Sequence, residues 1–363
     1  MSDTDTYIHI TDLNTAQLEE LVISLGEPAY RAKQLQYWLY HGLAGSFQEM
    51  NNLPPAFREA LAGKTRLHSL TPLQELKGRD GTIKVLLALP DGGTVESALM
   101  LYPAAGHTRT TVCLSTQAGC AIGCPFCATG QQGFERNLTS GEIIDQVLYF
   151  ARHLKQQDTT ISNLVFMGMG EPLANYDAVW QAIEVLNSPQ GFCLGARNMV
   201  ISTAGLVPGI KRLAREKLQV GLAVSLHASD NALRDKLVPV NRQFPLEILI
   251  STCREYFKLT GRRISFEYIL FAGINDSPEQ ARSLARLLAG LNCHVNLIPA
   301  NTTANRAFRP PSRPDIDAFT GELNKQHIVC TLRQSRGQSI DAGCGQLRSR
   351  YLALQGRSLD SSI

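Results

Sequence analysis

The feature that most constrains the fold of this sequence is an alternation of strand and helix patterns between residues 110 and 300. Six short segments rich in apolar and β-branched residues predict strands, at residues 111–115, 163–167, 198–202, 220–226, 264–270 and 295–298. Amphipathic helical patterns lie between them, at residues 139–151, 177–186, 208–216, 246–259 and 278–288. These repeats predict a parallel sheet of the α/β class. Because a complete barrel has eight such units, we expect a partial, six-unit barrel, to which residues 327–333 can add a strand.

The loop after the first predicted strand carries Cys120, Cys124 and Cys127 in the spacing C-x3-C-x2-C. Glycines and a proline around these cysteines indicate an exposed loop rather than a buried apolar segment. A zinc finger or ribbon would need a second Cys or His pair at short spacing, and none follows. An iron-sulfur cube is normally held by four cysteines, so three ligands leave one iron open to a small molecule. Reductive cleavage of S-adenosylmethionine requires such a centre.

Polar residues cluster where the other predicted strands end, which is where a parallel barrel carries its chemistry. Two glycines before Glu171 would let the backbone approach a ligand closely, and its carboxylate can pair with an ammonium group such as that of S-adenosylmethionine. Turns, helix caps or packing would explain each residue separately, but the shared bias of several strand ends favours one ligand site. Its candidates are Gly168, Gly170, Glu171, Ser202, Ser225, His227 and Asn301.

The chain before the barrel divides into two parts. Residues 1–72 read as a small helical domain, whose first helix Asn14 or Thr15 can cap. Residues 73–105 contain turn signals that predict a β-hairpin extension, in which Glu96 lies among apolar residues. A glutamate in a strand usually faces solvent, so Glu96 alone indicates little. We assign residues 106–348 to the barrel and expect residues 349–363 to be a peripheral tail.

The composition is that of an ordinary globular protein, with 44% hydrophobic and 18% charged residues. No apolar run is long enough for a membrane span, and the polar, acidic N-terminus is unlike a signal peptide. We therefore expect a cytoplasmic protein without a membrane partner. A net charge of +3 neither supports nor excludes RNA binding.

Two further cysteines stand apart from the loop. Cys113 lies in the first predicted strand, seven residues before Cys120, and Cys344 is flanked by Gly343 and Gly345. Flanking glycines give Cys344 the accessible backbone that a reactive thiol needs. Spacing alone leaves open whether Cys113 and Cys344 act as a pair.

Several separated motifs, in matching order, resemble the RlmN/Cfr family of radical S-adenosylmethionine RNA methyltransferases. They are RAKQLQYWLYHG at 31–42, VFMGMGEPL at 165–173, SLHA at 225–228, VNLIPAN at 295–301 and RGQSIDAGCGQL at 336–347. The resemblance covers nearly the whole chain and is nearest to the RlmN branch, which methylates C2 of adenine. It implies a radical-SAM partial barrel preceded by an RNA-binding accessory domain.

The resemblance also implies roles for individual residues. Cys120, Cys124 and Cys127 match the ligands of a [4Fe-4S] cluster. The contacts of S-adenosylmethionine correspond to Gly170, Glu171, Ser202, Ser225, Leu226, His227 and Asn301. Cys344 matches the cysteine that is methylated first, Cys113 the cysteine that forms a transient disulfide with it, and Glu96 the proton acceptor.

The family chemistry uses two molecules of S-adenosylmethionine per turnover, because adenine C2 is too electron-poor to attack a methyl group directly. One methylates Cys344; the other is split into a radical that takes hydrogen from this methyl group. The new carbon radical adds to C2, Glu96 removes the C2 proton, and Cys113 releases the RNA. The substrates implied are an adenosine in the peptidyl-transferase centre of 23S ribosomal RNA and one beside the anticodon of tRNA. An electron donor such as flavodoxin and a monomeric state are also expected.

Two alternatives remain. A relative of the Cfr type, which methylates C8, is disfavoured because Pro172 follows Glu171. A catalytically idle RNA-binding or cluster-storage relative is disfavoured because all five cysteines are present. The chain departs from the usual family pattern at Thr302 and Gly343, where proline and alanine are expected.

Overall fold

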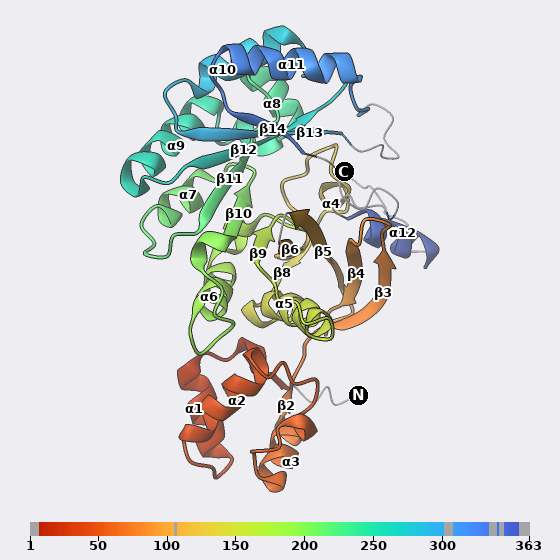
Figure 1. The fold of residues 1–363 in the computed structure, drawn as a ribbon, viewed down its shortest axis with the longest axis vertical. Coiled ribbons are helices and arrows are strands. Elements are labelled where there is room, and N and C mark those ends of the chain that lie inside the picture. The colour runs from red at the N-terminus through yellow and green to blue at the C-terminus, as the bar shows by residue number, and fades with distance from the viewer. Residues whose placement is uncertain (1–6, 105–106, 301–307, 334–339, 341–344, 356–363) are drawn as a thin grey trace.

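A computed structural model describes residues 7–104, 107–300, 308–333, 340 and 345–355. Its centre is a ten-stranded sheet, open at both edges, with the order β14-β13-β12-β11-β10-β9-β6-β5-β4-β3 (Figure 1). None of the helices in the described residues is long and apolar enough to cross a membrane.

Seven neighbouring strands of this sheet are parallel and form the expected partial barrel. They are β6 (His107–Cys113), β9 (Asn163–Phe166), β10 (Met199–Thr203), β11 (Gly221–Ser225), β12 (Ile264–Leu270), β13 (Cys293–Pro299) and β14 (Cys330–Leu332). The prediction of a partial α/β barrel is confirmed, and β14 lies within the additional strand expected at 327–333.

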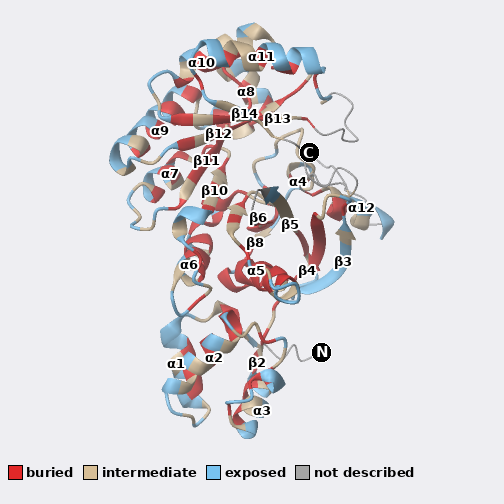
Figure 2. Ribbon diagram, viewed as in Figure 1, coloured by how far each residue is buried: buried red, intermediate tan, exposed pale blue. Residues whose placement is uncertain are grey.

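Helices cover the outer face of the parallel strands, with their apolar sides buried against the sheet (Figure 2). They are α5 (Ser140–Lys155), α6 (Tyr176–Asn187), α7 (Val207–Leu213), α8 (Asn231–Leu237), α9 (Leu246–Thr260), α10 (Pro278–Leu288) and α11 (Arg313–Lys325). The capping box predicted for α5 is present, since Thr139 and Glu142 exchange hydrogen bonds of 3.1 and 2.9 Å. Helices α8 and α11 were not predicted from the sequence, although Asp230 and Ser312 cap them.

The predicted hairpin is part of the barrel sheet. Strands β3 (Thr71–Lys77), β4 (Ile83–Ala88) and β5 (Thr94–Ala104) pair antiparallel, and β5 pairs antiparallel with β6. The hairpin therefore extends the sheet in place of forming a separate bridge. Because β4 and β5 are mostly buried, the hairpin supplies a wall of the barrel.

The N-terminal segment is helical, as predicted. It contains α1 (Thr15–Ser24), α2 (Tyr30–Tyr40) and α3 (Pro55–Lys64), together with the short strands β1 (Ile8–His9) and β2 (Thr65–Arg66). Asn14 caps α1. The segment lies beside α5 and α6 (Figure 1), and Oδ1 of Asp12 accepts a 2.7 Å hydrogen bond from the Gly141 amide at the start of α5.

The C-terminal part of the chain that the structure describes is a helix. Helix α12 (Gln346–Leu354) crosses the predicted boundary at residue 348 and contacts β5 and α4 (Ala128–Gln131). Its Leu347 and Arg348 are buried. The packing of this helix was not predicted from the sequence, because its contacts are made largely through hydrogen bonds.

Candidate active site

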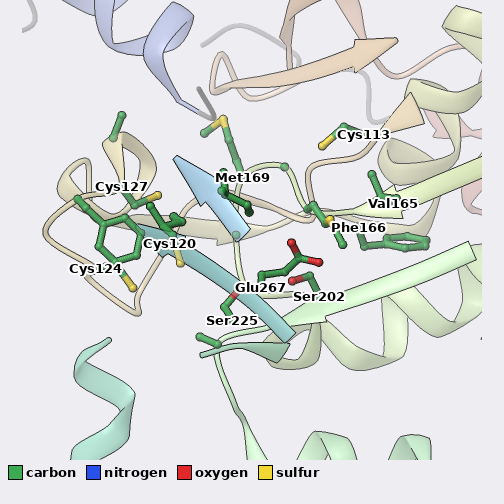
Figure 3. Close-up of a pocket in the computed structure, with 18 of the residues that line it drawn as sticks. Cys113, Cys120, Cys124, Cys127, Val165, Phe166, Met169, Ser202, Ser225 and Glu267 are labelled. Carbon is green, nitrogen blue, oxygen red and sulfur yellow. The ribbon is translucent and has the colours of Figure 1, made fainter. Parts of the chain in front are cut away.

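A cavity of about 450 Å³ opens at the carboxyl ends of the parallel strands, a size suited to a small-molecule ligand. One wall is the cysteine loop after β6, a second is formed by the ends of β9, β10 and β11, and a third by the inner faces of β4, β5 and β6. Figure 3 shows the loop cysteines on one side of this cavity and Cys113 on another.

The cysteine loop is held at its base by a two-stranded antiparallel sheet of β7 (Gln117–Gly119) and β8 (Phe134–Asn137). Gly119 has a φ of +74°, and a Cβ atom there would lie 1.9 Å from the carbonyl oxygen of Gly133. Only glycine permits this closure. The Cys120 amide donates a 2.7 Å hydrogen bond to the same oxygen, which fixes the first cysteine at the cavity wall.

The donor set of the loop fits an iron-sulfur cube. Cys120, Cys124 and Cys127 all line the cavity. Burial raises the pKa of the Cys120 thiol to about 12 and also raises that of Cys124, so a cationic group is needed to hold them as thiolates. The described residues contain no set of three His, Cys, Asp or Glu side chains arranged around one metal ion. In a cube each thiolate binds a different iron, which allows a wider spacing of sulfur atoms.

Glu171 lies at the end of β9 and is 3% exposed. Its carboxylate accepts hydrogen bonds from the amides of Leu173 and Ala204, at 3.1 and 2.7 Å. Burial raises its pKa to about 7, an effect that these hydrogen bonds oppose. The side chain therefore ties the ends of β9 and β10 together at the cavity wall.

The glycines before Glu171 also permit a close approach between two segments of the protein backbone. A Cβ atom on Gly170, whose φ is +102°, would lie 2.6 Å from Cβ of Gln117, and one on Gly168 would lie 2.7 Å from the Leu114 carbonyl oxygen. In the described residues, the close backbone approach is thus to the segment after β6. It brings the β9 turn and the cysteine loop into contact.

The next two strands present neutral hydrogen-bonding groups. Ser202 on β10 and Ser225 on β11 line the cavity, as does His227. Nδ1 of His227 accepts a 3.1 Å hydrogen bond from the Ile269 amide, so the proton of the neutral ring is at Nε2. Burial, assisted by the charge of Arg234, lowers the pKa of His227 to about 3. The ring is therefore a neutral donor.

Glu96 on β5 is buried, contrary to the expectation for a glutamate in a strand. Its Oε2 lies 2.8 Å from Nζ of Lys84 and accepts a 2.8 Å hydrogen bond from the Gly345 amide. Its Oε1 accepts a 2.6 Å hydrogen bond from the Arg348 amide. The carboxylate thus faces a buried cation and the first turn of α12.

Cys113 lies on the same wall of the cavity as Glu96. It pairs directly with Ala98 across β5 and β6, and Glu96 is two residues from Ala98 on the same face of β5. Such diagonal neighbours in an antiparallel pair are about 7–8 Å apart. The structure therefore brings together a carboxylate and a thiol that are distant in the sequence.

Three of the predicted site residues are not placed in the cavity. The side chain of Leu226 is fully buried in the hydrophobic core, although its carbonyl accepts a hydrogen bond from Arg234. Asn301 and Cys344 lie outside the described residues. Cys344 directly precedes Gly345, whose amide is bound to Glu96.

Several charged residues of the site were not predicted from the sequence. Lys84, Glu267 and Arg333 line the cavity, and Oε2 of Glu267 lies 3.4 Å from a guanidinium nitrogen of Arg333. Arg234 is fully buried and donates to the carbonyls of Ala204, Ser225 and Leu226 beneath the strand ends. Lys84 and Glu267 could have been identified from the sequence, because each is a single charged residue within an otherwise largely apolar strand.

Comparisons with known proteins agree with this geometry. Residues 8–67 match the ribosomal RNA large subunit methyltransferase N-terminal domain, and residues 114–285 match the radical SAM superfamily. A Moorella thermoacetica protein named "Probable dual-specificity RNA methyltransferase RlmN" is 48% identical over 346 residues, which cover 94% of this chain and 98% of that protein. A Nitrosopumilus maritimus protein named "Ribosomal RNA large subunit methyltransferase N" is 48% identical, with 92% and 96% covered.

A solved structure is similar over nearly the same length. The crystal structure of a radical SAM methyltransferase from Sphaerobacter thermophilus has a TM-score of 0.90 and 48% sequence identity. The match covers 93% of this chain and 98% of that chain. Both the sheet and the N-terminal helices therefore have a counterpart of known structure.

Proposed function

Because the chain belongs to the RlmN family of radical S-adenosylmethionine RNA methyltransferases, we propose that it methylates C2 of adenosine. The substrates are an adenosine in the peptidyl-transferase centre of 23S ribosomal RNA and an adenosine beside the anticodon of tRNA. The observation that carries this proposal is a single cavity lined by the three loop cysteines, the polar strand ends and the pair Glu96 and Cys113.

The family uses a [4Fe-4S] cluster and S-adenosylmethionine. In this chain Cys120, Cys124 and Cys127 are the residues that hold the cluster. When bound, the cluster supplies the electron that splits S-adenosylmethionine and so provides radical chemistry. Ser202, Ser225 and the Nε2–H group of His227 offer neutral hydrogen bonds that suit the ribose and carboxylate groups of this cosubstrate.

Glu96 is proposed to accept the proton from C2. A carboxylate has about four acceptor positions, and Lys84, the Gly345 amide and the Arg348 amide use three of them. Among the described residues no further partner uses the fourth position, which can take a proton arriving from the cavity.

Cys344 and Cys113 are proposed as the two reactive thiols. Cys344 is bonded to Gly345, whose amide lies 2.8 Å from Glu96, and Cys113 lies on the same wall as Glu96. One thiol on this wall and a second that adjoins Gly345 in the chain suit the order of carbon transfer, proton removal and thiol attack. The attack forms a disulfide bond between Cys113 and Cys344, and the bond that breaks joins the sulfur of Cys344 to the methylated RNA.

The remaining partners follow from the substrates. We expect the protein to act in the cytoplasm, as a monomer, with an electron donor such as flavodoxin. The test is anaerobic reaction of the reconstituted enzyme with ribosomal RNA and tRNA and methyl-labelled S-adenosylmethionine. Labelled adenosine in either RNA is expected, whereas cosubstrate cleavage without RNA labelling would support the idle or cluster-storage alternative.

A further inference from the structure

The buried guanidinium group of Arg348 joins the first turn of α12 to three other elements. Its Nε donates to Oγ1 of Thr94 on β5 at 2.9 Å, and one terminal nitrogen donates to Oε1 of Gln132 after the cysteine loop at 2.6 Å. The other terminal nitrogen donates to Oε1 of Glu135 on β8 at 2.5 Å. Arg348 is 2% exposed, so the guanidinium group itself is buried.

The backbone of the same turn is held from two sides. Glu96 accepts hydrogen bonds from the amides of Gly345 and Arg348. Nε2 of Gln132 donates to the Gly345 carbonyl at 3.0 Å. The residue that follows Cys344 in the chain is therefore bound both to the strand that carries Glu96 and to the end of the cysteine loop.

Gly345 itself packs against the cysteine loop. It has a φ of +80°, and a Cβ atom there would lie 2.5 Å from Oγ1 of Thr129, two residues after Cys127. Glycine is required for this approach. The distance between the cluster-binding loop and the segment of Cys344 is consequently set by direct contact and by the hydrogen bonds of Arg348 and Gln132.

Burial of an arginine is costly unless its donors are satisfied. Two acceptors of Arg348 are the neutral side chains of Thr94 and Gln132, and the third, Glu135, is 46% exposed. An apolar side chain would fill the same space without this cost. A positioning role would explain why a buried arginine stands at residue 348, since its guanidinium group joins α12 to β5, Gln132 and β8.

We propose that Arg348 is a positioning residue that holds Gly345, the residue bonded to Cys344, at a fixed distance from the cluster-binding loop, an inference that rests on the proposed function. Arg348 does not line the cavity and acts through Gln132 and the turn at Gly345. The step that needs this distance is hydrogen-atom transfer. A C–H bond of the methyl group on Cys344 breaks and a C–H bond forms at the 5′ carbon of the cleaved cosubstrate. Small misplacements of reacting groups can slow a reaction about a hundredfold.

The test compares Arg348→Met and Arg348→Lys with Arg350→Met, an exposed arginine in the same helix as a matched control. The readout is the number of 5′-deoxyadenosine molecules formed per methylated adenosine. We expect Arg348→Met to bind iron normally and to raise this ratio at least tenfold, Arg348→Lys to raise it less, and Arg350→Met to leave it unchanged. A wild-type ratio in Arg348→Met would overturn the proposal.

A second readout does not depend on turnover. Amide hydrogen exchange of residues 345–349 in the full-length protein should be at least tenfold faster in Arg348→Met than in the wild type, and unchanged in Arg350→Met. Unchanged exchange in Arg348→Met would contradict the positioning role.

If Arg348→Met does not fold, Gln132→Ala and Thr94→Val, which each remove one acceptor, must raise the product ratio. If the wild type makes no methylated RNA, the proposed function fails. Fast amide exchange in Arg348→Met would then still support the role of Arg348 in holding the turn at Gly345.

Discussion

The ammonium group of Lys84 lies 2.8 Å from the carboxylate of Glu96, and both side chains are 4% exposed. They face each other across β4 and β5, where Leu86 is the direct partner of Glu96 and Lys84 that of Ala98. A buried pair of this kind is strongly coupled, because removing one side chain deprives the other charge of this partner. The pair supports Glu96 at the point where it binds the first turn of α12.

Replacing Lys84 with Met should therefore destabilise the protein by about 3–5 kcal/mol, the usual cost of breaking a buried ion pair. Denaturant unfolding measures the loss. Combining Lys84→Met with Glu96→Gln should cost less than the sum of the two single changes, because the uncompensated carboxylate is gone. Additive effects would show that the two charges do not depend on each other.

Replacing Cys344 with Ala should abolish RNA methylation and leave cleavage of S-adenosylmethionine intact. The reason is that neither the loop cysteines nor the polar strand ends include this thiol. Liquid chromatography of 5′-deoxyadenosine and of RNA nucleosides measures the two activities separately. RNA methylation at the wild-type rate would disprove the two-cysteine mechanism.

Replacing Cys113 with Ala should trap RNA on the protein, because release requires attack by this thiol. Cys113 lies beside Glu96 on the cavity wall. We expect methylation of Cys344 and addition of its carbon to C2 to persist in this variant. A denaturing gel with labelled RNA should show a protein-RNA band with Cys113→Ala. The band should be absent from the double variant that also carries Cys344→Ala, and its absence from the single variant would count against the assignment.

His227 should make the protein less stable in acid. Its folded pKa of about 3 lies below its ordinary value of 6.5, so the unfolded chain binds the proton more readily. The stability from neutral His227 is present above pH 6.5 and is lost as pH falls toward 3. At pH 4.5 the loss is on the order of 3 kcal/mol.

The matched variant for this prediction is His227→Asn. Asparagine tolerates the positive φ of 58° at this position, and its side-chain oxygen can accept from the Ile269 amide. Unfolding free energies of both proteins at pH 7.5 and pH 4.5 give the comparison. The wild type should lose more stability than the variant on acidification; equal losses would show that His227 is not the titrating group.

The sequence predicted the parallel strands and the cysteine loop because their signals are local. Residues 264–270 and 278–288 have strand and helix patterns that match β12 and α10 from end to end. Tertiary placement was harder to predict. Glu96 was expected on a solvent-exposed face, yet Lys84 and the amides of α12 satisfy it inside the barrel. Those partners come from remote positions that periodicity cannot connect.

The role of α12 was missed for a related reason. Its apolar residues lack a helical period, and Leu347 is the one that is buried, while its docking depends on hydrogen bonds of Arg348 with Thr94, Gln132 and Glu135. A packing role of the glycine motif before Glu171 was also not predicted. Its glycines accommodate Gln117 and the Leu114 carbonyl, which are contacts that appear only once β6 and β9 are paired.

The central claim is that carbon reaches adenine C2 through a protein-bound methyl group. The most direct test is mass spectrometry of nucleosides from ribosomal RNA and tRNA after anaerobic reaction with trideuteromethyl S-adenosylmethionine. The account predicts 2-methyladenosine that retains two deuterium atoms, with the third found in 5′-deoxyadenosine. A product methylated at C8, or a 2-methyladenosine that retains all three deuterium atoms, would contradict it.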